Sequence, residues 1–85
     1  MERKKEPLFL TEALVKEIGG ESEWDKITEL VLHDLNVQEI AALDKCTNLR
    51  SLDLSFNALE RIKGLRALKD LRELKLYGNA LTEIE

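Results

Sequence analysis

The sequence predicts an α/β fold, a solenoid with a short parallel sheet, a helical or 3₁₀ convex side and a helical cap at its N-terminal end. Apolar positions recur with a period of 22 residues from Ile27, Leu49 and Leu71, and the residues that follow keep the same offsets in each unit. The stretch before Ile27 has the spacing of an amphipathic helix instead. We therefore expect an N-terminal tail and cap over 1–26 and repeats over 27–85, divided into 27–48, 49–70 and an incomplete 71–85.

The predicted cap contains a helix over 12–18. Thr11 is a typical N-cap residue, and Gly19-Gly20 supplies a left-handed stop at the other end. The first coil of a solenoid has an uncovered apolar end, which one face of this helix is expected to cover. The residues expected to do so are Leu14, Val15, Ile18 and Trp24.

Two further features of the N-terminal segment can be interpreted. Ser22, followed three residues later by Asp25, predicts a second short helical turn with the Ser22 hydroxyl on the free amides at its start. The charged stretch Met1–Glu6 predicts a disordered tail.

Each repeat is expected to open with a parallel strand, because apolar and polar residues alternate there with a period of two. The inward side chains are then Leu30, Leu32, Leu52, Leu54, Leu74 and Leu76. Later apolar positions continue the interior column into a helical or 3₁₀ return. Cys46 occupies a leucine position in that column, so we interpret its lone thiol as packing and not as a redox group.

Asn57 and Asn79 stand where the chain leaves the second and third strands. An asparagine carboxamide both donates and accepts hydrogen bonds, so stacked asparagines can bridge neighbouring turns as a structural ladder. The first unit departs from this pattern, with Leu35 at the equivalent position and Asn36 one residue later.

The second and third units keep the pattern L-x-x-L-x-L-x-x-N-x-L, which resembles the 22-residue phosphatase-regulator class of leucine-rich repeats. The helix before the first repeat is similar to that of dynein light chain and of ciliary and centrosomal leucine-rich-repeat adaptors. This resemblance implies a non-catalytic adaptor that binds a protein partner through the concave sheet or its edges. It also implies an intracellular, cytoplasmic location, with the cytoskeleton, cilium or centrosome as candidate sites.

The outward strand positions form the predicted partner-binding surface on the concave face. Its aromatic residues are of the kind that anchor protein interfaces. Three columns make a small area compared with a standard interface of about 800 Å² a side. The predicted contact residues are Glu29, Val31, His33, Asp53, Ser55, Phe56, Glu73, Lys75 and Tyr77.

Other functions are disfavoured by the residues present. His33, Asp53 and Ser55 have the residue types of a hydrolase triad, but an open sheet supplies no preorganised oxyanion donors or water-excluding cleft, so no catalytic residue is expected. A single histidine with scattered carboxylates predicts no metal or cofactor. With 17 acidic and 13 basic side chains, nucleic acid is not an expected partner. No apolar run is long enough to predict a membrane span or a secretory signal, and the single cysteine favours a reducing compartment.

The third unit stops before its helical return, which leaves an apolar end without a covering coil. The residues expected at this open end are Leu74, Leu76, Leu81 and Ile84. Two explanations stay open, a fragment of a longer solenoid and a homodimer formed through this end or through the unpaired edge strand. The second gives the alternative function, a structural segment that assembles through its uncapped end.

Overall fold

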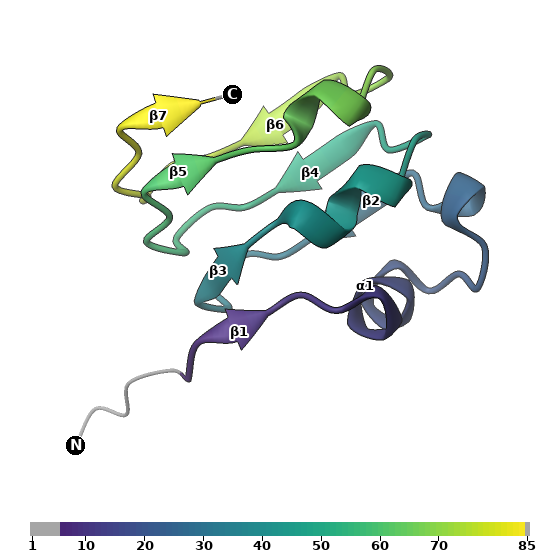
Figure 1. The fold of residues 1–85 in the computed structure, drawn as a ribbon, viewed down its shortest axis with the longest axis horizontal. Coiled ribbons are helices and arrows are strands. Elements are labelled where there is room, and N and C mark those ends of the chain that lie inside the picture. Colours follow the sequence, from purple (N-terminus) through teal and green to yellow (C-terminus); the bar gives the residue numbers. More distant parts are fainter. Residues whose placement is uncertain (1–5, 85) are drawn as a thin grey trace.

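The computed structural model describes residues 6–84, and within them the side chains of all residues except Ala41, Glu83 and Ile84. The predicted tail, Met1–Glu6, therefore lies almost wholly outside the described residues. The chain rises in successive coils from the helix α1 (Glu12–Gly19) at one end to the strands β6 (Glu73–Lys75) and β7 (Glu83–Ile84) at the other (Figure 1).

A three-stranded parallel sheet runs through the stack. Its strands are β2 (Glu29–Val31), β4 (Ser51–Asp53) and β6 (Glu73–Lys75), hydrogen-bonded in the order β2-β4-β6. Leu30, Leu52 and Leu74 are aligned across the three strands, so equivalent residues of successive units lie side by side at an offset of 22. This parallel pairing agrees with the predicted strands. The exposed side of this sheet, here named the outer sheet face, corresponds to the predicted concave face.

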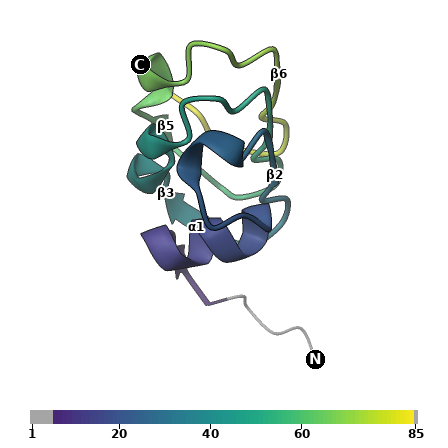
Figure 2. The same cartoon turned by 90° about the vertical axis from the view of Figure 1, so that its right-hand side faces the viewer.

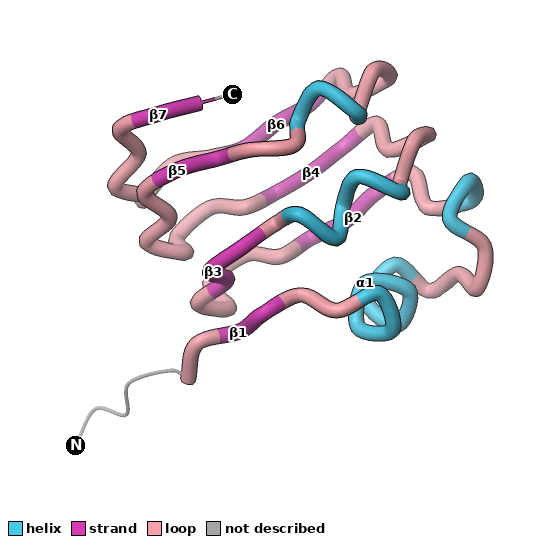
Figure 3. Tube along the Cα trace, in the orientation of Figure 1, coloured by secondary structure: helices cyan, strands magenta, loops and turns pink. Residues whose placement is uncertain are grey.

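The opposite side of each coil holds short strands that the repeat pattern did not predict. They are β1 (Leu8–Phe9), β3 (Val37–Glu39), β5 (Arg61–Ile62) and β7 (Glu83–Ile84), which pair in parallel as β1-β3 and β5-β7. The returns that follow are 3₁₀ helices, η2 (Ala41–Lys45) and η3 (Leu65–Ala67). In Figure 3 two strands joined by a turn precede each of these returns.

The core is a continuous column of leucine and other apolar side chains. Leu30, Leu52, Leu32 and Leu54 are all 1% exposed or less, because each lies between neighbouring coils. Cys46 is also fully buried, and burial, followed by the charge of Asp44, raises the pKa of its thiol. The thiol is therefore a packed group with little thiolate character.

Helix α1 (Glu12–Gly19) lies across the first coil, at the end of the stack opposite β6 (Figure 2). The hydroxyl of Thr11 accepts a hydrogen bond from the Leu14 amide at 3.1 Å, and Gly20 ends the helix with a φ of 72°. Val15 is fully buried against the first unit. Glu12 is also paired with Lys45 of η2, which ties the exposed side of the helix to the first return.

The prediction for Ser22 is wrong. The turn η1 (Trp24–Lys26) begins one residue later than predicted, with Glu23 at its N-cap and no side-chain capping bond. The Lys26 amide bonds to the Glu23 carbonyl at 3.2 Å, so the turn is closed by backbone alone and the Ser22 hydroxyl is one position too early to cap it.

Candidate protein-binding surface

Three aromatic side chains lie in a row on the outer sheet face, one from each unit. The centroids of His33 and Phe56 are 5.3 Å apart in an edge-to-face arrangement, and those of Phe56 and Tyr77 are 6.3 Å apart. Phe56 is 51% exposed and Tyr77 is 60% exposed, with Val31 beside them at 55%. We name His33, Phe56 and Tyr77 the aromatic row. It presents a contiguous apolar area of the kind that protein interfaces use as anchors.

Phe56 occupies a backbone position that disfavours its side chain. The equivalent residues of the three units, Asp34, Phe56 and Gly78, all have left-handed backbones, with φ values of 54°, 59° and 72°. Aspartate and glycine tolerate this conformation, whereas for a bulky residue it costs about 1–2 kcal/mol. The chain therefore holds an exposed aromatic ring at a position whose backbone favours glycine, asparagine or aspartate.

Gly78 provides the space for that ring. A Cβ atom at Gly78 would lie 2.2 Å from Phe56 Cδ1, which is far inside van der Waals contact. The Phe56 ring is thus laid directly over the backbone of the third unit. Sequence reasoning did not identify Gly78 as a site residue, although its place 22 residues after Phe56 and 44 after Asp34 was a usable signal.

An ionised carboxylate lies beside the aromatic row. Asp53 Oδ1 accepts a hydrogen bond from the Ser55 amide at 2.9 Å, and its Oδ2 is 3.7 Å from His33 Nδ1. The Ser55 hydrogen bond, with weaker support from the charges of His33 and Lys75, lowers the pKa of Asp53 below its usual value. This part of the face therefore carries a fixed negative charge next to exposed rings.

The other predicted contact residues lie on the same face, with one exception. Glu29 and Glu73 are exposed, and Lys75 is half-buried, 3.9 Å from the Glu73 carboxylate. Ser55 is the exception, because it is fully buried and its hydroxyl has no hydrogen-bond partner among the described residues. Its prediction as a contact residue is wrong. A small side chain in the middle unit is flanked by the larger His33 and Tyr77 at the same offset, so it does not reach the surface.

The burial of Ser55 also bears on the hydrolase triad considered above, since its hydroxyl lies beneath the surface that a substrate would reach. In the described part of the chain, no three His, Cys, Asp or Glu side chains gather where they could share a metal ion. Likewise, none of the helices between residues 6 and 84 has both the length and the apolar character that a membrane crossing needs.

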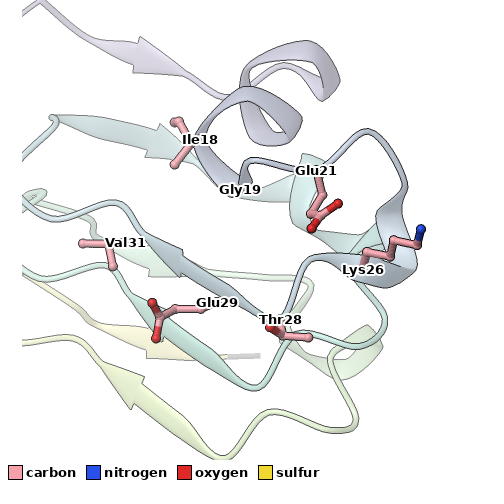
Figure 4. Close-up of a pocket in the computed structure, with 7 residues that line it drawn as sticks. All are labelled: Ile18, Gly19, Glu21, Lys26, Thr28, Glu29 and Val31. Carbon is pink, nitrogen blue, oxygen red and sulfur yellow. The ribbon is translucent and has the colours of Figure 1, made fainter.

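A hollow of about 320 Å³ adjoins the outer sheet face at its N-terminal end (Figure 4). It lies between the C-terminal end of α1 and strand β2, and Glu29 and Val31 of the outer sheet face form part of its wall. Glu21 and Lys26 line its other side, as Figure 4 shows. The hollow extends the face toward the helix, and sequence reasoning missed it because its residues come from three separate elements.

Hydrogen bonds of the turn asparagines join the turns of neighbouring units beside this face. Asn57 is 1% exposed, and its Oδ1 accepts from the amides of Leu35 at 3.1 Å and Val37 at 3.0 Å. Its Nδ2 donates to the carbonyls of Leu32 and Leu54, both at 2.8 Å. One carboxamide thus binds the turn of the preceding unit and the end of its own strand.

Asn79 repeats the arrangement one unit later. Its Oδ1 accepts from the amides of Asn57 at 3.1 Å and Leu59 at 2.9 Å, and its Nδ2 donates to the Leu54 carbonyl at 2.9 Å. Each of these asparagines hydrogen-bonds to the turn of the preceding unit. The first unit has no preceding repeat, so an asparagine at its equivalent position would have no such turn to bind. This explains why Leu35 can occupy that position.

The end of the stack beyond β6 is less covered than its interior. Leu74 is 36% exposed, whereas the equivalent Leu30 and Leu52 are 1% and 0% exposed. Leu76 and Leu81 are half-buried. The side chain of Ile84, also predicted at this end, lies outside the described residues.

The return segments of the second unit carry several basic residues, but the groove beside them is mixed in charge. Arg61 and Lys63 line a groove of about 860 Å³ between the first and second units, but Glu39, Asp44 and Glu60 line the same groove. It therefore carries no uniform field that would select an acidic partner.

The parallel strands, their offset of 22 and the asparagine-bridged turns define a repeat protein whose coils share one core. Residues 47–85 match a family model described as Leucine Rich repeats (2 copies), which supports a leucine-rich-repeat protein. Such repeats generally mediate protein–protein interaction and are typically non-catalytic. No curated protein and no solved structure shows a significant match to the chain.

Proposed function

We propose that the outer sheet face binds a protein partner and that the aromatic row is its anchor. The observation that carries this proposal is Phe56, an exposed ring on a left-handed backbone that lies between two other rings. Backbone conformation alone favours glycine, asparagine or aspartate there, so a role in binding accounts for the phenylalanine.

The chemistry of the face indicates what the partner presents. Exposed rings and Val31 suit an apolar or aromatic side chain, and the ionised Asp53 suits a neighbouring cation. The face is preorganised, because its turns are bound by Asn57 and Asn79, so little side-chain or loop ordering is needed on association.

The proposal is tested by affinity capture with the 85-residue chain, followed by a binding titration with each purified candidate. Phe56→Asn removes the ring and is compatible with the left-handed backbone, so it should weaken binding at least about tenfold without lowering stability. Phe9→Asn is the matched control, because Phe9 is also an exposed phenylalanine, at 60%, but lies on β1 away from the outer sheet face.

A partner that is lost equally with both variants, or with neither, contradicts the proposal. Tyr77→Ala gives an independent check, since it removes a second ring of the row and should weaken the same partner.

We also propose a more specific assignment of this chain among leucine-rich-repeat proteins. Residues 27–85 act as the repeats of a solenoid, and residues 1–26 act as its N-terminal tail and cap, supported by the packing of α1 on the first coil and by the burial of Val15. The resemblance to the phosphatase-regulator class supports an intracellular adaptor of a cytoskeletal, ciliary, centrosomal or phosphatase complex. Imaging of the tagged protein in cells, combined with proximity labelling, tests this assignment.

A further inference from the structure

The strand β6 forms an open edge of the three-stranded sheet in the described part of the chain. The segment around β4 forms backbone hydrogen bonds with alternate residues of β6. The Leu54 amide donates to the Lys75 carbonyl at 2.9 Å, and the Glu73 amide donates to the Arg50 carbonyl at 3.0 Å. In a parallel pair, the residues between the bonded ones point their backbone N–H and C=O groups away from the partner strand. The amides of Leu74 and Leu76 therefore face the edge, as do the carbonyls of Arg72 and Leu74.

The opposite edge of the sheet differs. Helix α1 packs against β2, so the first strand is covered, whereas nothing described lies beyond β6. Exposed apolar surface accompanies the free backbone groups, since Leu74 is 36% exposed and Leu76 and Leu81 are only half-buried. An edge strand of this kind is a template for pairing with another strand.

The charges on β6 select the occupant. Glu73 and Lys75 flank Leu74 on the outer sheet face with opposite signs. If a second β6 pairs antiparallel about Leu74, each Glu73 lies opposite the Lys75 of the other copy, and two cross-strand ion pairs form. A parallel pairing of two β6 strands in the same register would instead place like charges together.

The backbone groups fit the same register. Antiparallel pairing about Leu74 lets the two Leu74 residues exchange a pair of N–H to C=O hydrogen bonds. The Leu76 amide of each copy then meets the Arg72 carbonyl of the other. The Arg72 amide and the Leu76 carbonyl remain, and both are already hydrogen-bonded within the chain. The Arg72 amide donates to the Arg50 carbonyl, and the Leu76 carbonyl accepts from Asn79 Nδ2. Every free edge group of this stretch thus finds a partner.

We propose that two copies of this chain associate through β6, antiparallel about Leu74, to form one continuous six-stranded sheet. The two sets of Leu74, Leu76 and Leu81 side chains then cover each other across the two-fold axis. This interaction is separate from the partner-binding role of the aromatic row. The pairing involves one short strand and a limited apolar area, so the association is expected to be weak and dependent on concentration.

The test is sedimentation equilibrium of the 85-residue chain over a concentration series up to millimolar, at low ionic strength. The wild-type chain should pass from monomer to dimer. Lys75→Glu replaces both ion pairs by like-charge contacts and should weaken the dimer about tenfold, and Glu73→Lys should do the same. The double variant Glu73→Lys with Lys75→Glu restores both pairs with their signs reversed, so the dimer should return.

Glu29→Lys is the matched control, because Glu29 is aligned with Glu73 through Ser51 but lies on β2, at the covered edge. It should leave the dimer unchanged. These positions are solvent-exposed or half-buried, and circular dichroism of each variant checks that it folds.

A second measurement identifies the contact directly. Carbodiimide cross-linking of a mixture of unlabelled and isotope-labelled chains should give a mixed-isotope link between Glu73 and Lys75. A chain that remains monomeric at millimolar concentration overturns the proposal. A dimer that ignores both single charge changes, or that the double variant does not restore, overturns it as well.

Discussion

Replacement of Asn57 by alanine should be one of the most destabilising single changes in this chain. The substitution deletes a carboxamide that is 1% exposed and leaves the buried Val37 amide and the Leu32 carbonyl without their hydrogen bonds. Other groups are spared, since the Leu54 carbonyl keeps the bond from Asn79 and the Leu35 amide lies at a partly exposed turn.

The magnitude follows from these two orphaned groups. Each of these two buried unsatisfied groups costs about 1–3 kcal/mol, so Asn57→Ala should lower the free energy of unfolding by about 2–6 kcal/mol. An 85-residue domain has a total stability of about 4–13 kcal/mol, so this loss is a large fraction of the whole. A urea m-value of about 1 kcal/mol/M converts it into a fall in midpoint of about 2 M or more.

The assay is equilibrium urea unfolding followed by circular dichroism. Asn48→Ala is the matched control, because Asn48 makes one exposed hydrogen bond, from its Nδ2 to the Asp25 carbonyl at 2.7 Å. Its loss should cost less than about 1 kcal/mol. If the two variants have similar midpoints, the asparagine ladder does not stabilise the stack and the reasoning fails.

Two further predictions concern the outer sheet face. Gly78→Ala should lower the urea midpoint and shift the Phe56 ring resonances, because its Cβ would meet the ring at 2.2 Å, whereas Gly20→Ala has the same φ of 72° and open space, and should show the backbone cost alone. The lowered pKa of Asp53 means that its charge stabilises the fold above its unfolded value of 3.8, and this contribution is lost as the pH falls through the folded pKa. The difference in urea midpoint between wild type and Asp53→Asn should therefore be constant above about pH 5 and shrink below pH 3.8. If Gly78→Ala and Gly20→Ala lower the urea midpoint equally, the contact between Gly78 and the Phe56 ring does not matter for stability. If the midpoint difference between wild type and Asp53→Asn grows in acid, the inference about the Asp53 charge is wrong.

Much of the fold was predictable because a repeat of 22 residues places equivalent side chains at equivalent positions. Leu30, Leu52 and Leu74 could be assigned to one inward column, and Thr11 with Gly20 marked the ends of α1. The pairing of β1 with β3 was not predictable, since two residues have no periodicity from which to infer a strand.

The candidate site was predictable only in part. Alternation along a strand says which side a residue faces, and His33 and Tyr77, which alternation points outward, are exposed. Alternation could not place Phe56, which follows the strand on a left-handed backbone. Exposure, however, also depends on the size of the side chains on neighbouring strands, and Ser55 is buried among larger neighbours for that reason.

The sequence by itself determined the period, the inward columns, the helix α1 and the asparagines that bridge the turns, because these depend on local pattern and on a register that every unit shares. Only the tertiary structure decided that Phe56 lies over Gly78, that Ser55 is hidden, and that Glu73 and Lys75 flank an open strand edge. Those features arise where units meet, and the distance between side chains from different coils is set by the packing of the whole stack.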